Sequence, residues 1–234
     1  MMMDAVRLYT AIFFIYAIAG WVMESVMFSV KNKKPMNRGF LVGPVCPIYG
    51  YGVVLISVLL KKYQHDLFAT FCMSVILCGL LEYFTSYFME KMFHARWWDY
   101  SRKKYNINGR ICLENLVLFG IAACVILFIV NPFLIREIRK IPEILLNITL
   151  SVMCAMYIAD NITSFKIVFN LKQVSNEVKD NTAEISEKVR KIIHSKSLLH
   201  RRMVNSFPHI KENVAFKKWT IKEFGKKIQP KKEN

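Results

Sequence analysis

Long apolar runs separated by short polar connections dominate the chain up to Leu171. Five of them approach or exceed the ~20 residues that an α-helix needs to cross a bilayer. They are Val6 to Val30, Gly43 to Leu60, Leu67 to Phe93, Ile111 to Ile135 and Ile144 to Leu171. The pattern therefore predicts an all-α fold, a polytopic transmembrane helix bundle of about five spans.

The stretch from Asn37 to Gly52, NRGFLVGPVCPIYGYG, does not fit a continuous helix. Glycine lowers helix propensity, and proline is tolerated mainly in the first turn of a helix. Irregular backbone at membrane depth needs protein groups to satisfy its hydrogen bonds. We therefore expect a loop that packs back against the membrane, is covered by other parts of the chain and then starts the second helix. Whether the short run from Gly43 to Leu60 spans fully is left open.

The region after residue 170 is polar and basic. An apolar residue recurs at every seventh position from Leu171 to Leu199, which is half of a coiled-coil seam and predicts a cytoplasmic amphipathic helix. After Pro208, apolar residues on one face amid many lysines predict a basic segment on the membrane surface. The chain thus divides into a transmembrane domain (1–170), a helix (171–206) and a surface segment (207–234).

Charge is distributed unevenly along the chain. The net charge is +16, and the 33 Lys and Arg residues fall into 16 up to Lys140 and 17 from Lys166 onward. With 54% hydrophobic residues, the chain is too apolar for an ordinary soluble domain. The basic tail therefore predicts contact with anionic lipid of the inner leaflet, and no nucleic acid is expected as a partner.

Basic residues in the short connections predict the orientation of the bundle. Ten lie in the connections after the first and third runs, against six in the segments on the opposite side. Because cytoplasmic loops are enriched in Lys and Arg, we expect the N-terminus outside the cell membrane and the tail in the cytoplasm.

Charged side chains within and beside the runs form one candidate cluster. Glu82, Ser86 and Glu90 share one face of the third run at a spacing of four residues, and Glu82 should face the interior to find a partner or carry a proton. The acids either serve a substrate or pair with arginines to hold the bundle together; both interpretations stay open. The candidate residues are Glu24, Asn37, Arg38, Glu82, Glu90, Arg96, Trp97, Trp98, Asp99, Asn108, Arg110 and Glu114.

The connection from His94 to Arg110, HARWWDYSRKKYNINGR, carries the densest polar signal. Its tryptophans suit an aromatic belt at the headgroup level, but a belt does not explain Asp99 between aromatic residues. Asn108 and Gly109 predict a turn and a cap before the fourth run. Near the end of the fifth run, Asp160 and Asn161 are expected to interrupt the helix and make a polar contact.

Several blocks together resemble a known family. GWVMES, NRGFLVGPVCPIYGYG, LLEYFTSYFMEKMFHARWWDYS and NINGRICLEN, in this order between Tyr9 and Pro132, resemble the ABC-transporter type IV family of bacterial membrane proteins, found mostly in Gram-positive bacteria. The resemblance implies a permease. Since the chain has no GxxxxGK[ST] loop, an ATPase would be a separate subunit.

Three functions fit these features. The first is a permease-like transporter subunit with an unnamed substrate. The second is an intramembrane enzyme or binding protein acting on lipid headgroups, with acids such as Glu24 and Glu82 in acid–base roles. The third is a scaffold or sensor that recruits partners through its tail. The absence of a nucleotide-binding or hydrolase motif favours a role without enzymatic activity but leaves the second function open, and the absence of metal-ligand spacing predicts no cofactor or metal. A homo-oligomer is a further candidate partner.

We predict that Lys33, Trp98 and Lys218 lie on the same, cytoplasmic side of the membrane. A cysteine at each position, in a chain without its native thiols, should react with a membrane-impermeant reagent from that side only. Lys62→Cys is the control and should react from the other side. Reaction of Lys33→Cys and Trp98→Cys from opposite sides would rule out this topology.

Overall fold

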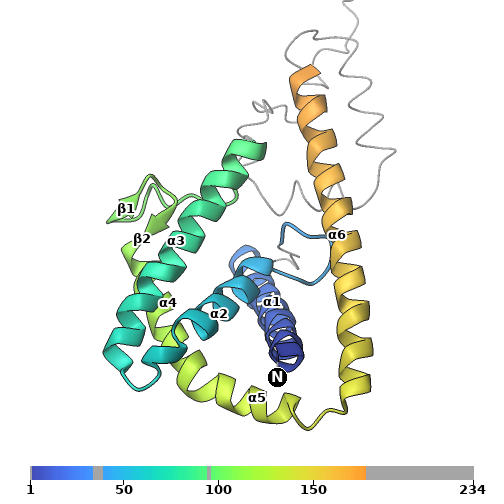
Figure 1. Ribbon diagram of the computed structural model, residues 1–234. Coiled ribbons are helices and arrows are strands. Elements are labelled where there is room, and N and C mark those ends of the chain that lie inside the picture. Colours follow the sequence, from blue (N-terminus) through green and yellow to red (C-terminus); the bar gives the residue numbers. More distant parts are fainter. Residues whose placement is uncertain (1, 34–38, 94–95, 178–234) are drawn as a thin grey trace, which may run out of the picture.

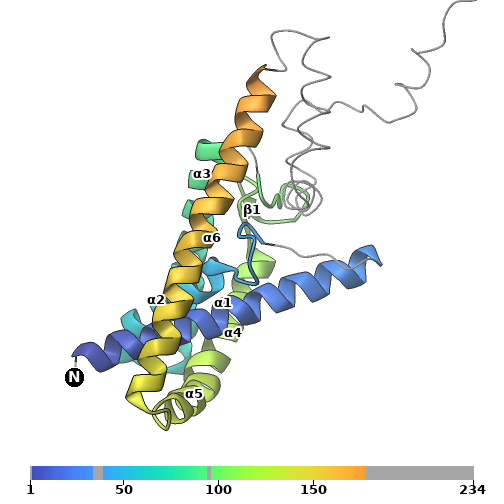
Figure 2. The ribbon, with the colours of Figure 1, turned by 90° about the vertical axis from the view of Figure 1, so that its right-hand side faces the viewer.

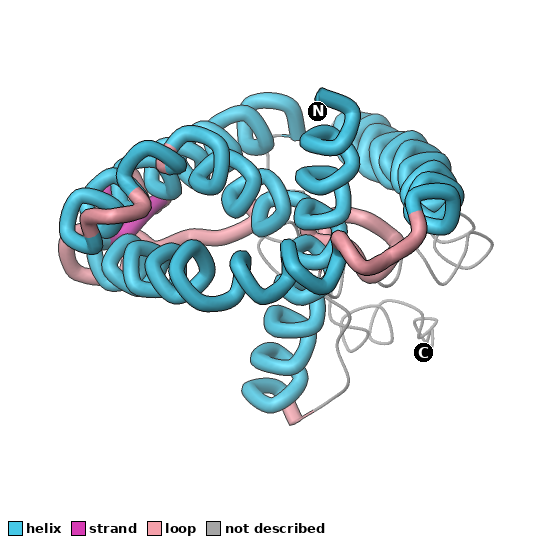
Figure 3. Tube along the Cα trace, turned by 60° about the horizontal axis from the view of Figure 1, so that its bottom comes forward, coloured by secondary structure: helices cyan, strands magenta, loops and turns pink. Residues whose placement is uncertain are grey.

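The computed structural model describes residues 2–33, 39–93 and 96–177. In this part of the chain nearly all regular structure is helical, and the two strands are very short (Figure 3). The elements are α1 (Met2–Asn32), α2 (Pro47–Leu59), the 3₁₀ turn η1 (Lys61–Tyr63), α3 (Leu67–Phe93), β1 (Asn106–Ile107), β2 (Ile111–Cys112), α4 (Leu113–Val125), the π-helical turn η2 (Ile126–Val130), α5 (Asn131–Ile138) and α6 (Glu143–Glu177).

Four helical segments are long and apolar enough to cross a membrane: Met3–Lys31, Leu67–Met92, Leu113–Ile138 and Glu143–Lys166. The predicted transmembrane helix bundle is therefore confirmed. The second apolar run forms only the 13-residue helix α2, which is about 20 Å long against ~30 Å of hydrocarbon. Residues 43–46 stay outside the helix, which begins with Pro47 at its first position.

Figure 1 shows the arrangement of the helices. α3 and α4 pack side by side, α6 stands on the opposite side, and α1 with α2 lies between them. α1 runs across α6 rather than along it (Figure 2). At one end of the bundle, Arg7 of α1 pairs with Glu143 at the start of α6, with 2.8 Å between Nη1 and Oε2. The first residues of α1 and α6 therefore share that end.

The fourth apolar run bends where the sequence predicts a continuous span. The helix passes from α4 through the π-helical turn η2 into α5, which turns away beneath the bundle in Figure 1. Pro132 lacks the N–H that an α-helix would use and forces its neighbours apart, which accounts for the wider turn just before it. The bend buries Asn131, which accepts from the Tyr16 hydroxyl at 2.8 Å and donates to Ser57 Oγ at 2.9 Å.

The apolar core has two centres. One joins α1, α2, α5 and α6 through Ala11, Ile12, Phe14, Val53, Ile138 and Leu150. The other joins α2, α4 and η2 through Ile56, Leu60, Ala123 and Leu127. α2 contributes to both centres. This short helix thus links the α1–α6 side of the bundle to the α3–α4 side.

The loop between α1 and α2 is held by protein groups, as its sequence predicts. The carboxylate of Asp160 in α6 accepts from the backbone N–H of Val42 and of Gly43, each at 2.8 Å. Ser164 Oγ accepts from Val42 N–H at 3.1 Å, and Cys46 N–H donates to the Ala17 carbonyl at 2.9 Å. In Figure 1 this loop reaches across to α6. Asp160 therefore supplies the expected polar contact, although α6 continues through it without the predicted interruption.

A glycine at position 43 is required by this contact. A Cβ atom there would lie 2.8 Å from Asp160 Oδ2, which is closer than side-chain atoms normally approach. Any larger residue must push the carboxylate away from the two N–H groups it serves.

We predict that Gly43→Ala and Asp160→Ala each destabilise the folded chain by about 1–3 kcal/mol, because each weakens hydrogen bonds to buried backbone N–H groups. The double variant should lose less than the two single losses together, since the clash is gone once the carboxylate is removed. Thermal unfolding in detergent measures this. Thr163→Ala, on the exposed side of α6, is the control, and strictly additive losses would contradict the contact.

Candidate functional site

The third loop folds back onto α3 as a short hairpin. β1 and β2 pair antiparallel, and the turn between them has positive φ at Asn108 (52°) and Gly109 (67°). Asn-Gly is the preferred pair for such a turn, since both central residues must adopt positive φ. The predicted turn is present. The predicted cap is not, because the residue preceding α4 is Cys112 and no side chain caps the helix.

Four charged residues of the predicted cluster meet at the end of α3. Glu90 Oε2 lies 2.6 Å from Arg110 Nη1 and 3.1 Å from Arg96 Nε. Arg96 Nη1 also lies 3.6 Å from Asp99 Oδ1. The side chains of Glu90, Arg96, Asp99 and Arg110 are only 12–32% exposed, so solvent screens them incompletely. Two acids and two arginines compensate one another, and we call these four residues the ion-pair cluster.

The guanidinium of Arg110 is enclosed on α3. It lies over the rings of Tyr83 and Tyr87, with 5.7 and 5.4 Å to the ring centroids, and its Nη1 is 3.5 Å from Ser86 Oγ. Trp98 Nε1 donates to the Arg110 carbonyl at 3.0 Å. A planar, always charged guanidinium suits such a stacked position, which locks the hairpin to the helix.

Glu82 lies deeper in the bundle and faces inward, as its spacing with Ser86 and Glu90 predicts. It is 6% exposed, and its Oε1 accepts from the Tyr100 hydroxyl at 3.1 Å. Burial raises the pKa of the Tyr100 phenol, and the nearby Glu82 carboxylate raises it further. Tyr100 therefore keeps its proton at any working pH and acts as the donor.

Glu24 does not join the ion-pair cluster. Its Oε1, on α1, accepts from the hydroxyl of Tyr49 in α2 at 2.8 Å, and this contact is partly buried. Glu24 is near enough to Glu82 and Tyr100 to act on both electrostatically. Two carboxyls, each bonded by a tyrosine hydroxyl from another element, thus lie near one another, and we call Glu24, Tyr49, Glu82 and Tyr100 the carboxyl–tyrosine group.

Other predicted site residues lie elsewhere. Glu114 does not converge with the cluster; it pairs with Lys103 at 2.5 Å, and both side chains are half or more exposed. That hydrogen bond raises the pKa of Lys103. Asn108 donates to the Tyr83 hydroxyl at 3.0 Å beside the cluster. Asn37 and Arg38 lie outside the described residues.

Trp97 of the loop packs inside the protein rather than in a belt facing lipid, and Trp98 is partly buried. Trp97 is 5% exposed and stacks edge-on against Phe40 of the first loop, with 5.8 Å between ring centroids. Phe40 in turn contacts Phe165 of α6. The first loop, the third loop and α6 therefore meet at one end of the bundle, opposite Arg7 and Glu143.

Sequence reasoning missed the partners of the acids. Tyr49 and Tyr100 were read only as part of a helix start and of an aromatic loop, yet each donates to an interior carboxyl. Tyr16, Ser57 and Asn131 form a further buried polar contact without any motif. The available signal was the presence of hydrogen-bonding side chains in segments that must face other helices.

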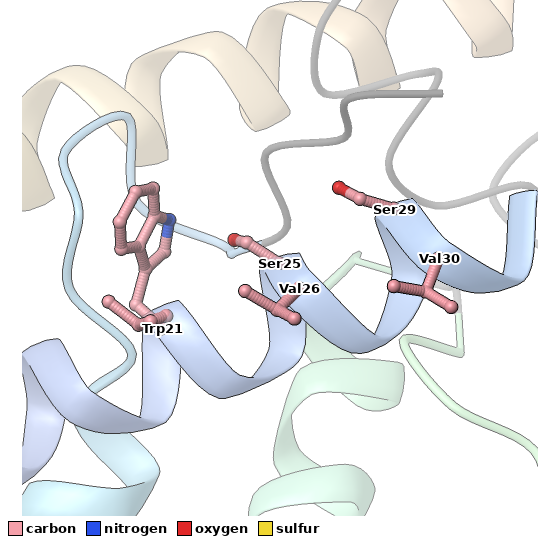
Figure 4. A pocket seen from close by; sticks show the side chains of 6 residues that line it. Trp21, Ser25, Val26, Ser29 and Val30 are labelled. Carbon is pink, nitrogen blue, oxygen red and sulfur yellow. The ribbon is translucent and has the colours of Figure 1, made fainter. Parts of the chain in front are cut away.

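Surface hollows add little to this site. One lies along α1 and is lined by Trp21, Val22, Ser25, Val26, Ser29 and Val30, and Figure 4 shows its labelled side chains following one another along this helix. Another is lined by Arg102, Lys103, Lys104, Tyr105, Leu113, Glu114, Val117 and Leu118. Among the described residues, no group of three or more His, Cys, Asp or Glu is placed to hold a metal ion.

Sequence comparison identifies the class of protein that this bundle belongs to. Residues 11–165, which include both loops, the ion-pair cluster and the carboxyl–tyrosine group, match the family described as "Putative ABC-transporter type IV". The match covers more than half of the chain, so the chain belongs to this family, and the resemblance stated from its sequence blocks is confirmed. No curated protein and no solved structure matches the chain.

We predict that Glu90→Gln lowers the free energy of unfolding by about 2 kcal/mol, since it leaves Arg110 partly buried without a counter-charge. Glu114→Gln is the matched control: it removes the same charge from an exposed pair and should change stability much less. Thermal unfolding of both variants in detergent compares them. Equal losses would mean that the ion-pair cluster does not hold the third loop to α3.

Proposed function

We propose that this chain is a permease-like membrane subunit of a transporter, with ATP bound and hydrolysed by a separate ATPase subunit. The observation that carries the proposal is the polar interior of a bundle in a chain of the ABC-transporter type IV family. Glu24 and Glu82 lie inside apolar spans, where ionisable groups are costly and commonly mark the path of a substrate or ion.

The ion-pair cluster and the carboxyl–tyrosine group support this proposal differently. In the ion-pair cluster each arginine has a carboxylate partner, so the cluster can serve structure alone. Glu82 has only the neutral hydroxyl of Tyr100 as a hydrogen-bond partner among the described residues. A structural bundle gains nothing from that arrangement, because an apolar side chain would pack at lower cost. The carboxyl–tyrosine group is therefore the part of the interior that fits a transport role.

A lipid-binding function is the second candidate, and the hollow beside the third loop favours it. This hollow is lined both by basic residues of the third loop and by apolar residues of α4: Arg102, Lys103, Lys104, Leu113, Val117 and Leu118. Basic groups suit the phosphate of an anionic headgroup, and the apolar side chains suit its acyl chain.

The test is purification of the tagged full-length chain from its native membrane in mild detergent. We expect a stoichiometric ATPase subunit whose ATP hydrolysis falls at least several-fold in Glu82→Gln, because the variant keeps the side chain's shape but not its charge. Glu137→Gln, on the surface of α5, is the control and should hydrolyse ATP at the unchanged rate.

Two outcomes would contradict the transporter proposal. One is a chain that purifies without an ATPase; the other is an ATPase that is indifferent to Glu82→Gln in a folded complex. Retention of anionic lipid that is lost in the double variant Arg102→Ala, Lys104→Ala, but kept in Lys61→Ala, Lys62→Ala, would support the lipid-binding function instead. Native mass spectrometry of the purified variants reads out both subunits and lipids.

A further inference from the structure

One oblique row of side chains along α3 is hydrogen-bonding or ionisable over nearly the whole length of the helix. They occur at every fourth position, and we call them the polar file: Thr70, Ser74, Cys78, Glu82, Ser86 and Glu90. At 1.5 Å per residue the file extends about 30 Å, which is the thickness of a hydrocarbon core. It therefore places such a group at each turn across the depth of a membrane.

The polar file faces protein throughout. Thr70 and Ser74 are fully buried, Glu82 and Ser86 are 6% and 5% exposed, and Cys78 and Glu90 are partly buried. A second row, whose members each follow a member of the polar file by two positions, is apolar and exposed. It consists of Ile76, Leu80, Phe84 and Phe88, which are 53%, 49%, 50% and 57% exposed. α3 thus turns an apolar row outward, toward lipid, and the polar file inward.

Two oxygens of the polar file are buried without a hydrogen-bond partner in the described part of the chain: Ser74 Oγ and Glu82 Oε2. Other members are bonded, since Thr70 donates to the Tyr63 carbonyl at 2.8 Å and Ser86 lies against Arg110. An unbonded buried oxygen costs about 1–3 kcal/mol unless water or a proton satisfies it. The two oxygens lie eight residues apart, about 12 Å along the helix.

The groups that act on Glu82 come from α1, α3 and the third loop. Tyr100 of the third loop donates to Oε1, Glu24 of α1 and Cys78 of α3 lie within electrostatic range, and Tyr49 of α2 holds Glu24. Arg110, the nearest cation of the ion-pair cluster along the file, is bonded to Glu90 and Ser86 instead. Within the described part of the chain, Glu82 therefore has a second acid nearby and no cationic partner.

We propose that Glu82 is a proton-exchange site inside the bundle and that water reaches it along the polar file. A hydronium ion transfers its proton to Oε2 and becomes water, and release to water reverses the step. Oε1 keeps its hydrogen bond from Tyr100 in both states. The proposal goes beyond the transport role and does not need it, because it concerns the isolated chain, and its test requires neither an ATPase nor a substrate.

The first test is infrared spectroscopy of the purified full chain in lipid nanodiscs as the pH is varied. We expect a C=O stretching band of a protonated carboxyl that appears and disappears reversibly, is lost in Glu82→Gln and is restored at a shifted frequency in Glu82→Asp. Glu137→Gln, at the surface, should keep the band. Tyr100→Phe should move the band to higher frequency, because it removes the hydrogen bond to Oε1. A spectrum without such a band, or a band that survives in Glu82→Gln, would overturn the site.

If Glu82→Gln does not fold, the Tyr100→Phe spectrum decides alone, since an unmoved band would not belong to Glu82.

The second test concerns the route by which water reaches Glu82. In a chain without its native thiols, Ser74→Cys in the polar file should react with a small water-soluble thiol reagent at least tenfold faster than Ile76→Cys in the outward row. Equal or reversed rates would show that water does not reach the file.

Discussion

Backbone N–H groups that have no partner within a helix need hydrogen-bond acceptors inside this bundle. The positions of the loops depend on which side chains supply those acceptors. The loop between α1 and α2 enters between helices, where neither lipid nor a strand can accept its N–H groups. Asp160 accepts two of them, and its carboxylate reaches them only because position 43 is glycine. This contact places the start of α2 beside the middle of α1, where Tyr49 meets Glu24.

The third loop meets the same requirement by another route. Its hairpin satisfies its own backbone, and a compensated set of charges attaches it to α3. Tyr100 is thereby held over Glu82, just as Tyr49 is held over Glu24. Glu90 and Asp99 have arginine partners, as a purely structural role would require. Among the described residues, Glu82 has the hydroxyl of Tyr100 as a hydrogen-bond donor and no ion-pair partner.

The two arrangements of acids differ in how easily their charge can change. Balanced ion pairs are strongly coupled and resist change, whereas a carboxyl held by a neutral hydroxyl can gain or lose a proton without losing its hydrogen bond. The two arrangements lie on the same face of α3, at Glu90 and Glu82, two helical turns apart.

The helical bundle, the glycine- and proline-rich loop, the inward position of Glu82 and the family could all be predicted from local patterns, because apolar length, helix breakers and four-residue spacing are local properties. Which acids meet which partners could not be predicted in this way. In the structure, Glu24 and Glu114 lie apart from the ion-pair cluster, and Trp97 packs against Phe40 instead of facing lipid. Helix α2 is also shorter than the predicted second run, and the fourth run is bent. These outcomes depend on contacts such as Val42 with Asp160, 118 residues apart, and no local pattern encodes which distant group will satisfy a buried N–H.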